Sequence, residues 1–104
     1  MCQHRVYTLR THEGLAAYQD VWARHIPSLA KHGITTHGVW TAPGAGVPQL
    51  HALVSYADGD DPQERDDAYM ASPQFRADLA GFDMSQFVSV TGTSLAPTDA
   101  SPLR

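Results

Sequence analysis

Residues 36–56 read THGVWTAPGAGVPQLHALVSY, and this stretch decides the fold. Two apolar runs rich in β-branched and aromatic residues, Thr36–Thr41 and Gln49–Tyr56, flank a segment of prolines and glycines, Ala42–Pro48. The prolines lack a backbone N–H and the glycines favour turn conformations, so this segment cannot continue a strand ladder. The stretch therefore predicts a β-hairpin with a loop longer than the minimal two residues.

On the N-terminal side of the hairpin, the sequence predicts a strand and then a long helix. His4–Arg10 has the composition of a strand. From Leu15 onward, apolar residues recur at spacings of three and four, which is the helical period, and Lys31-His32-Gly33 is a typical helix end. Pro27 lies inside this helix, so we expect a kink or a new turn there.

On the C-terminal side, two cap-plus-proline signals predict two short helices. Asp61-Pro62 opens the first, and Ser72-Pro73 opens the second. Gln86–Leu95 predicts a last strand, and we expect one domain over residues 1–96. Residues 97–104 contain two prolines and no periodicity, which indicates a C-terminal tail.

The predicted order, strand–helix–strand–strand–helix–strand, is typical of an α+β ferredoxin-like fold. This fold has a four-stranded antiparallel sheet with its helices on one face. The predicted strands place apolar side chains on both faces, and an uncovered apolar sheet face is rarely left in water. We therefore expect a homodimer in which two sheets face each other, a dimeric α/β barrel.

Composition excludes several classes of function. The chain has 104 residues, a net charge of -4 and only seven lysines and arginines, which are scattered, so it lacks the basic surface of a nucleic-acid-binding protein. It has no apolar run long enough to span a membrane and no signal-peptide pattern, so we expect no membrane partner and a cytoplasmic location. A single cysteine excludes an intramolecular disulfide and a cysteine-cluster metal site.

Several short motifs, in consistent order over residues 5–82, resemble the NIPSNAP family. These are YTLRT at residues 7–11, RHIP at 24–27, KHGI at 31–34, GVWT at 38–41, Tyr56, Arg65 and SPQF at 72–75. That family resembles the wider dimeric α/β-barrel superfamily. One departure lies in the third strand, where Pro48 and Ala52 replace the family's usual Asn and His, and His51 is displaced by one residue to the opposite side of the sheet.

The superfamily resemblance implies a small cofactor-independent enzyme of the monooxygenase, cyclase or isomerase type. Its partner would be a small hydrophobic cyclic or polyketide-like metabolite of a biosynthetic pathway, bound in a pocket between helices and sheet. The expected catalytic residues are His25 or His51 as the base, with Arg10 holding the resulting oxyanion. The expected substrate-binding residues are Tyr18, Trp22, His37, Trp40 and Tyr69.

Each of these residues also has a simpler interpretation. His25 shares the apolar helix face with Trp22, so it could be a buried histidine that bonds a backbone carbonyl. The aromatic residues could serve core and interface packing, and Arg10 could pair with an acidic neighbour. His37 and His51 lie on neighbouring strands without an acidic third ligand, so we expect no metal site.

Two alternatives to an enzyme remain open. The first is a non-catalytic dimeric protein that binds a ligand or acts as a scaffold. The second and weaker one is a haem-binding protein with His25 as the axial ligand. The sequence favours the cofactor-free enzyme, and we expect no cofactor.

Overall fold

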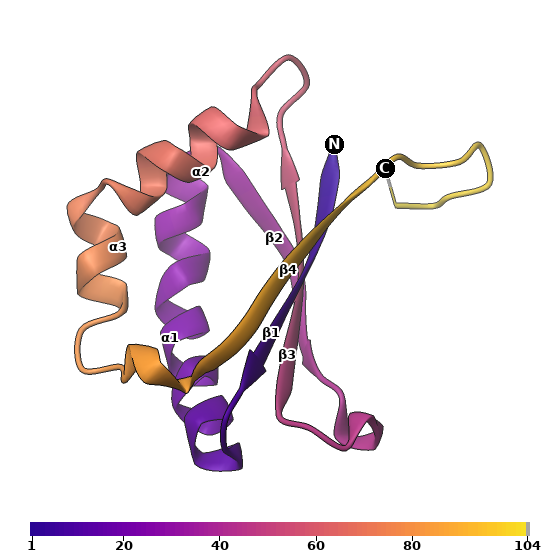
Figure 1. Ribbon diagram of the computed structural model, residues 1–104. Helices are drawn as coiled ribbons and strands as arrows, with labels where there is room; N and C mark the ends of the chain where they lie inside the picture. The colour runs from indigo at the N-terminus through magenta and orange to yellow at the C-terminus, as the bar shows by residue number, and fades with distance from the viewer. Residues whose placement is uncertain (104) are drawn as a thin grey trace.

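The computed structural model describes residues 1–103 and shows a four-stranded antiparallel sheet with helices on one face (Figure 1). The elements in chain order are β1 (Cys2–Leu9), α1 (His12–Lys31), β2 (Ile34–Thr41), η1 (Pro43–Ala45), β3 (Gln49–Tyr56), α2 (Pro62–Met70), α3 (Pro73–Asp78), η2 (Met84–Gln86) and β4 (Phe87–Leu95). The strand order β2-β3-β1-β4 confirms the predicted ferredoxin-like fold.

The helices begin at residues whose side chains cap them. The Thr11 hydroxyl accepts a hydrogen bond from the Gly14 N–H at the start of α1. Asp61 and Ser72 cap α2 and α3 in the same way, as the sequence predicted. However, α1 runs through Pro27 as one helix, so no new turn begins there. Pro27 faces solvent, whereas the buried residues on either side of it hold the helix against the sheet.

The central hairpin forms as predicted, with η1 in its loop, but β2 contains a bulge. Thr36 pairs with Val54, whereas Gly38 pairs with Leu53, so His37 is the extra residue. An extra residue reverses the alternation of side chains beyond it. The bulge therefore turns Trp40 to the face of the sheet that carries His51.

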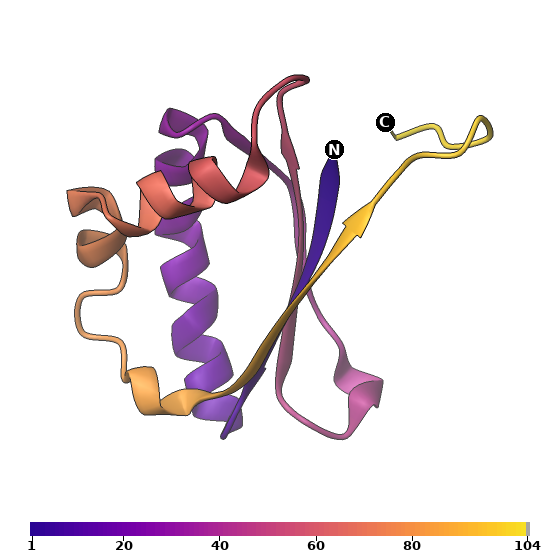
Figure 2. The same ribbon diagram turned by 45° about the horizontal axis from the view of Figure 1, so that its top comes forward.

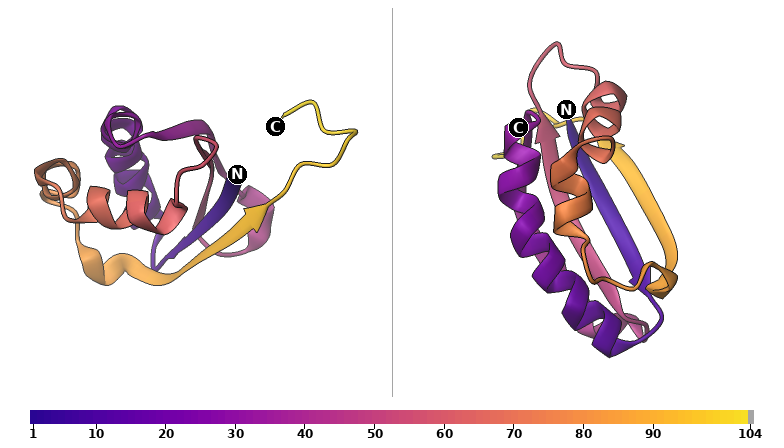
Figure 3. Two further views of the ribbon diagram at one scale, coloured as in Figure 1. Left: turned by 90° about the horizontal axis from the view of Figure 1, so that it is seen from above. Right: turned by 90° about the vertical axis from the view of Figure 1, so that its left-hand side faces the viewer.

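The main core lies between α1 and the sheet. It is formed by side chains from β1, α1 and β3 that are almost completely buried, including Leu9, Val21, Trp22, Leu29, Leu50 and Val54. Figure 3 shows α1, α2 and α3 in front of the sheet, with β4 at an edge that the helices leave uncovered. Most of β4 is consequently exposed, and Phe87 is its best-buried apolar contact with the core.

Within residues 1–103, no α-helix covers the opposite face of the sheet, as Figures 1 and 2 show. We call this the open face and define it by His4, Val6, Trp40, His51, Leu53 and Leu95. Trp40 is 55% exposed and Leu95 is 43% exposed on it. The sheet therefore has an uncovered face with exposed apolar side chains, although polar residues such as Thr8, Gln49 and Thr93 share it.

Residues 96–103 continue from β4 without a helix or strand and extend away from the helices (Figure 1). The division into a domain over residues 1–96 and a tail over 97–104 remains a prediction, and Arg104 lies outside the described residues. Over residues 1–103, none of the helices combines the length and apolar character that a membrane span requires.

Candidate functional site

A cavity of about 450 Å3 lies on the helix side of the sheet, where α1, α2 and α3 meet β1 and β4. Most of its wall is aromatic or aliphatic, including Tyr7, Tyr18, Trp22, Leu29, Phe75 and Phe87. Its polar wall residues are Gln3, Arg5, His25, Asp66 and Tyr69. An apolar cavity with a few polar groups is the usual form of a small-molecule site.

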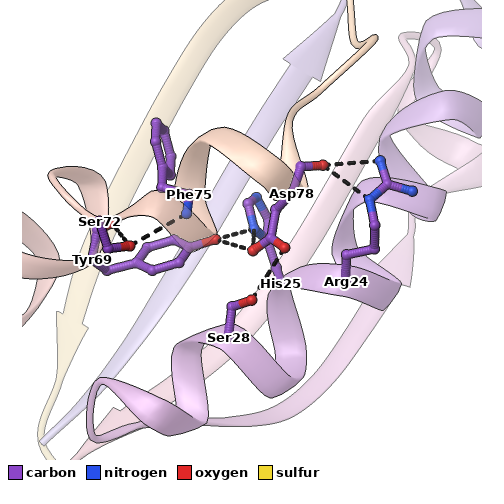
Figure 4. A network of polar contacts seen from close by, with 7 residues as sticks. All are labelled: Arg24, His25, Ser28, Tyr69, Ser72, Phe75 and Asp78. Carbon is purple, nitrogen blue, oxygen red and sulfur yellow. Dashed lines mark hydrogen bonds and ion pairs between the residues drawn. The ribbon is translucent and has the colours of Figure 1, made fainter.

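One polar cluster in this wall joins three helices (Figure 4). The His25 Nδ1 atom lies 3.2 Å from Asp78 Oδ2, and the Tyr69 hydroxyl donates to the same oxygen at 2.6 Å. The Ser28 hydroxyl donates to Asp78 Oδ1 at 3.1 Å, and the Tyr69 oxygen also contacts His25 Nδ1. Arg24 donates to the backbone carbonyl of Asp78, which fixes the end of α3 to α1.

The shifted pKa values of His25, Tyr69 and Asp78 determine which of these side chains carry a proton. Burial lowers the pKa of His25 and outweighs the opposing effect of Asp78. Burial alone would raise the pKa of Asp78, but hydrogen bonds from Tyr69, Ser28 and His25 bring this pKa below its usual value. Burial, followed by Asp78, raises the pKa of Tyr69. At neutral pH, Asp78 is therefore charged, Tyr69 is protonated and His25 is neutral.

This proton assignment leaves one ring nitrogen of His25 available. Because Asp78 is charged, it holds the hydrogen of the neutral imidazole on Nδ1, so Nε2 carries the lone pair. Nε2 has no hydrogen-bond partner in residues 1–103, and His25 lines the cavity. A histidine oriented by a carboxylate in this way can act as a general base.

A second polar cluster lies around Arg5 on β1. The Arg5 Nη2 atom donates to Asp66 Oδ1 at 2.8 Å and to the Tyr56 hydroxyl at 2.7 Å, and Arg5 Nε donates to Gln3 at 2.8 Å. Burial by itself lowers the pKa of Arg5, but Tyr7, Tyr56 and Asp66 together raise it above its ordinary value. Arg5 is thus a fixed cation in the wall of the cavity.

Between the two clusters, the wall offers further hydrogen-bond donors. Burial raises the pKa of Tyr18, so its hydroxyl keeps its proton. The Trp22 Nε1 atom is completely buried and has no acceptor of good geometry among residues 1–103. A buried donor without a partner costs free energy, but a ligand could reach one buried this deeply only if its neighbours moved.

Of the eight predicted site residues, the structure brings four into the cavity: Tyr18, Trp22, His25 and Tyr69. The other four, Arg10, His37, Trp40 and His51, lie outside it. Arg10 is exposed beyond the end of β1, where it donates to the Ser85 carbonyl. The structure therefore does not bring Arg10 and His25 together in the cavity.

The strand residues lie elsewhere because of side-chain alternation and the bulge. His51 projects from the open face, where its ring stacks on His4 and its Nδ1 lies 2.9 Å from His4 Nε2. Trp40 faces the same side, opposite His51. His37 is bonded to the Ser55 hydroxyl at 2.6 Å. None of the three reaches the cavity.

Sequence reasoning missed Arg5, Asp66 and Asp78 as site residues. Two of them carried a detectable signal. Arg5 shares its strand face with Tyr7 and Leu9, which are buried, and a charge on an apolar face usually has a partner. Asp78 adjoins Leu79, which packs against the core, and an isolated carboxylate in such a position is equally unexpected.

The fold and the cavity define an α+β ferredoxin-like protein with a pocket between helices and sheet. The NIPSNAP family model matches residues 2–102, and the chain therefore belongs to the NIPSNAP family. The resemblance in the sequence motifs is thus confirmed. No curated protein sequence matches the chain.

Three solved structures support the fold. A NIPSNAP family protein with unknown function from Agrobacterium tumefaciens has a TM-score of 0.81 at 19% identity, covering 99% of this chain and 92% of the other. An uncharacterized NIPSNAP domain protein from Burkholderia xenovorans has a TM-score of 0.78 at 15% identity and covers 97% of both chains. A second NIPSNAP family protein from A. tumefaciens has a TM-score of 0.78 at 23% identity, with coverages of 99% and 97%.

Proposed function

We propose that this NIPSNAP protein binds a small, mainly apolar molecule in the cavity and that His25 transfers a proton to or from it without a cofactor. The observation that carries the proposal is the unpaired Nε2 of a neutral histidine that lines a mainly apolar cavity, while its Nδ1 is held by Asp78. Asp78 is in turn held by Tyr69 and Ser28, so the imidazole is fixed before a ligand arrives.

In the proposed reaction, Nε2 removes a proton from an acidic C–H or O–H group of the ligand. The imidazolium that forms is stabilised by the Asp78 carboxylate, and the charge left on the ligand is stabilised by donors in the wall. Return of the proton at another atom is an isomerisation, and attack of the carbanion on a carbonyl of the same molecule is a cyclisation. A deprotonated ligand that reacts with molecular oxygen would give the monooxygenase outcome.

A non-catalytic binding protein is the second candidate, and one observation favours it. His25 Nδ1 contacts both Asp78 and Tyr69, and these contacts join α1 to α2 and α3. A histidine can make such contacts for structural reasons alone. The cavity would then hold the same class of molecule without changing it.

Solvent deuterium exchange distinguishes the two candidates. Native mass spectrometry of the protein from its own host identifies a retained small molecule, which is then incubated with fresh protein in D2O and followed by NMR. We expect deuterium incorporation by the wild type and a rate at least ~100-fold lower with His25→Gln. His12→Gln, which alters an exposed histidine at the start of α1, is the matched control.

A ligand that is bound but takes up no deuterium would favour the binding protein. If no molecule is retained, the fluorescent apolar probe N-phenylnaphthylamine tests the cavity directly. A wild type that neither retains a molecule nor binds this probe would overturn the proposed function.

We also propose that two copies of the chain associate through their open faces to form a dimeric barrel. Exposed Trp40 and Leu95 lie on this face beside the half-buried Val6 and Leu53. Since no helix of the described chain covers the face, a second copy related by a twofold axis would bury it with identical chemistry on both sides.

A further inference from the structure

We propose that the ligand of the cavity is a hydrophobic carboxylic acid whose carboxylate binds Arg5, with Asp66 limiting how tightly it binds. This inference rests on the proposed function for the cavity as a ligand site, and it adds the chemical class of the ligand. It concerns the end of the cavity formed by β1, β4 and α2, away from the Asp78 cluster.

The first support is the incomplete hydrogen bonding of Arg5. Its Nη2 atom is shared by Asp66 and Tyr56, and its Nε atom is bonded to Gln3. Nη1 makes no hydrogen bond of ordinary geometry within residues 1–103, and the nearby Tyr7 hydroxyl is only a weak partner of the guanidinium. A guanidinium has five N–H donors in a rigid, planar arrangement. A bidentate ion pair would use two of its nitrogens, whereas Asp66 contacts only Nη2. Here the protein fixes two nitrogens and leaves the third for another acceptor.

The second support is the location of this free nitrogen. Arg5 lies in the middle of β1, on the strand face that also carries Tyr7, and both residues line the cavity. The Tyr7 hydroxyl lies close enough to Arg5 to raise its pKa, partly through a weak hydrogen bond that falls outside ordinary geometry. A carboxylate can accept from a guanidinium and a phenol at once, and bonds to a charged donor are stronger than neutral ones.

The third support is access along β4. The residue opposite Arg5 in β4 is Gly92, which places no side chain over the guanidinium. A Cβ at Gly92 would lie only 3.2 Å from the Gln3 amide nitrogen, so even alanine would crowd this end of the cavity. Met70, Met84 and Val90 line the cavity and are each at least half exposed. The route to Arg5 therefore passes apolar side chains, which suits an amphipathic molecule.

The charges at this end of the cavity limit its affinity for an anion. Arg5 and Asp66 together are neutral, so a bound carboxylate is attracted by the guanidinium and repelled by Asp66. From this position the apolar body of the ligand would extend past Tyr18 and Trp22 toward His25. A carboxylate at one end and a proton-transfer group at the other would orient the molecule in the cavity.

A matched pair of ligands tests the inference. Naphthoate and naphthamide have the same apolar skeleton and nearly the same size, but only naphthoate is charged. Their affinities are measured by displacement of bound N-phenylnaphthylamine from the wild type and from three folded variants: Arg5→Met, Asp66→Asn and Arg76→Met. Arg76 is exposed on α3 and outside the cavity, so its variant is the control for loss of one positive charge.

We expect Arg5→Met to weaken naphthoate about tenfold or more and to leave naphthamide within about twofold. Asp66→Asn removes the repelling charge, so it should strengthen naphthoate binding and leave naphthamide unchanged. Arg76→Met should change neither ligand.

Equal losses for both ligands in Arg5→Met, or an unchanged naphthoate affinity in Asp66→Asn, would overturn the inference. If Arg5→Met fails to fold, the Asp66→Asn result decides alone. Binding of N-phenylnaphthylamine without any preference for the acid would remove only this inference. Absence of probe binding to the wild type would remove the proposed function as well.

Discussion

At the scale of single residues, the unusual feature of this protein is a neutral histidine buried beside a charged aspartate. Burial penalises an imidazolium, and the Asp78 carboxylate, which would favour it, is already bonded to Tyr69 and Ser28. The carboxylate therefore orients His25. Its hydrogen bonds from Tyr69 and Ser28 reduce its ability to stabilise a protonated imidazole. This balance is what a general base near neutral pH requires.

The depressed pKa of His25 predicts a pH dependence of stability. The pKa is lowered from 6.5 in the folded protein, so the unfolded chain binds the proton more readily. The contribution of His25 is complete above pH 6.5 and is lost as the pH falls toward the folded pKa. One such group changes the free energy of unfolding by at most about 1.4 kcal/mol per pH unit. Urea denaturation at several pH values should show this fall in the wild type and a shallower one in His25→Gln.

The matched control for this prediction is His12→Gln, because His12 is exposed and outside the cavity. Its stability profile should follow the wild type throughout the acidic range. A His25→Gln profile parallel to that of the wild type would show that the proton on His25 does not contribute to the pH dependence.

At the scale of elements, the junction between α2 and α3 positions the site. The Ser72 hydroxyl donates to the Tyr69 carbonyl and accepts from the Phe75 N–H, so one buried side chain ends α2 and caps α3. Loss of an N-cap costs about 1 kcal/mol. Ser72→Ala should cost more than this, about 2 kcal/mol, because it also removes a second buried hydrogen bond, the one that the Ser72 hydroxyl donates to the Tyr69 carbonyl. Denaturant unfolding measures the loss.

Asp61→Ala is the comparison, since Asp61 caps α2 at an exposed position through the Gln63 N–H. It should cost about 1 kcal/mol and leave ligand binding intact. Ser72→Ala should in addition weaken binding in the cavity, because Tyr69 and Asp78 lie on the two helices it joins. Equal costs for the two variants would show that Ser72 is only a helix cap.

The elements were predictable where local chemistry determines them. Prolines and glycines mark the loop of the central hairpin. Asp61 and Ser72 mark the starts of α2 and α3, because their side chains cap these helices. The bulge at His37 was not predicted, because no local signal specifies an inserted residue, and it decides which face of the sheet Trp40 occupies.

The candidate site was predictable only in part, for a related reason. Tyr18, Trp22 and His25 were found because the period of α1 places them on the face directed at the core, whereas Tyr69 was found only as an aromatic residue. Asp78 joins His25 across 53 residues of sequence, and Asp66 joins Arg5 across 61. Such pairings depend on how the helices dock on the sheet. Patterns within single elements cannot supply them.

At the scale of the whole molecule, the two faces of the sheet differ in what covers them. The helix face holds the core and the cavity, whereas the open face exposes Trp40 next to the stacked rings of His4 and His51. Tryptophan is among the residues that contribute most to protein interfaces when it is buried in them. If a second copy covers the open face, Trp40 should dominate the free energy of association.

Trp40→Asp should therefore raise the dimer dissociation constant about thirtyfold or more, as measured by sedimentation equilibrium over a range of concentrations. The matched control is Met70→Asp, because Met70 is 50% exposed but lies on the helix side, at the cavity. It should leave the dimer unchanged. Both variants introduce one negative charge. A difference between their dimer dissociation constants would therefore result from the face of the sheet on which the charge lies, and not from the charge itself. A monomeric wild type, or equal weakening by the two variants, would contradict association through the open face.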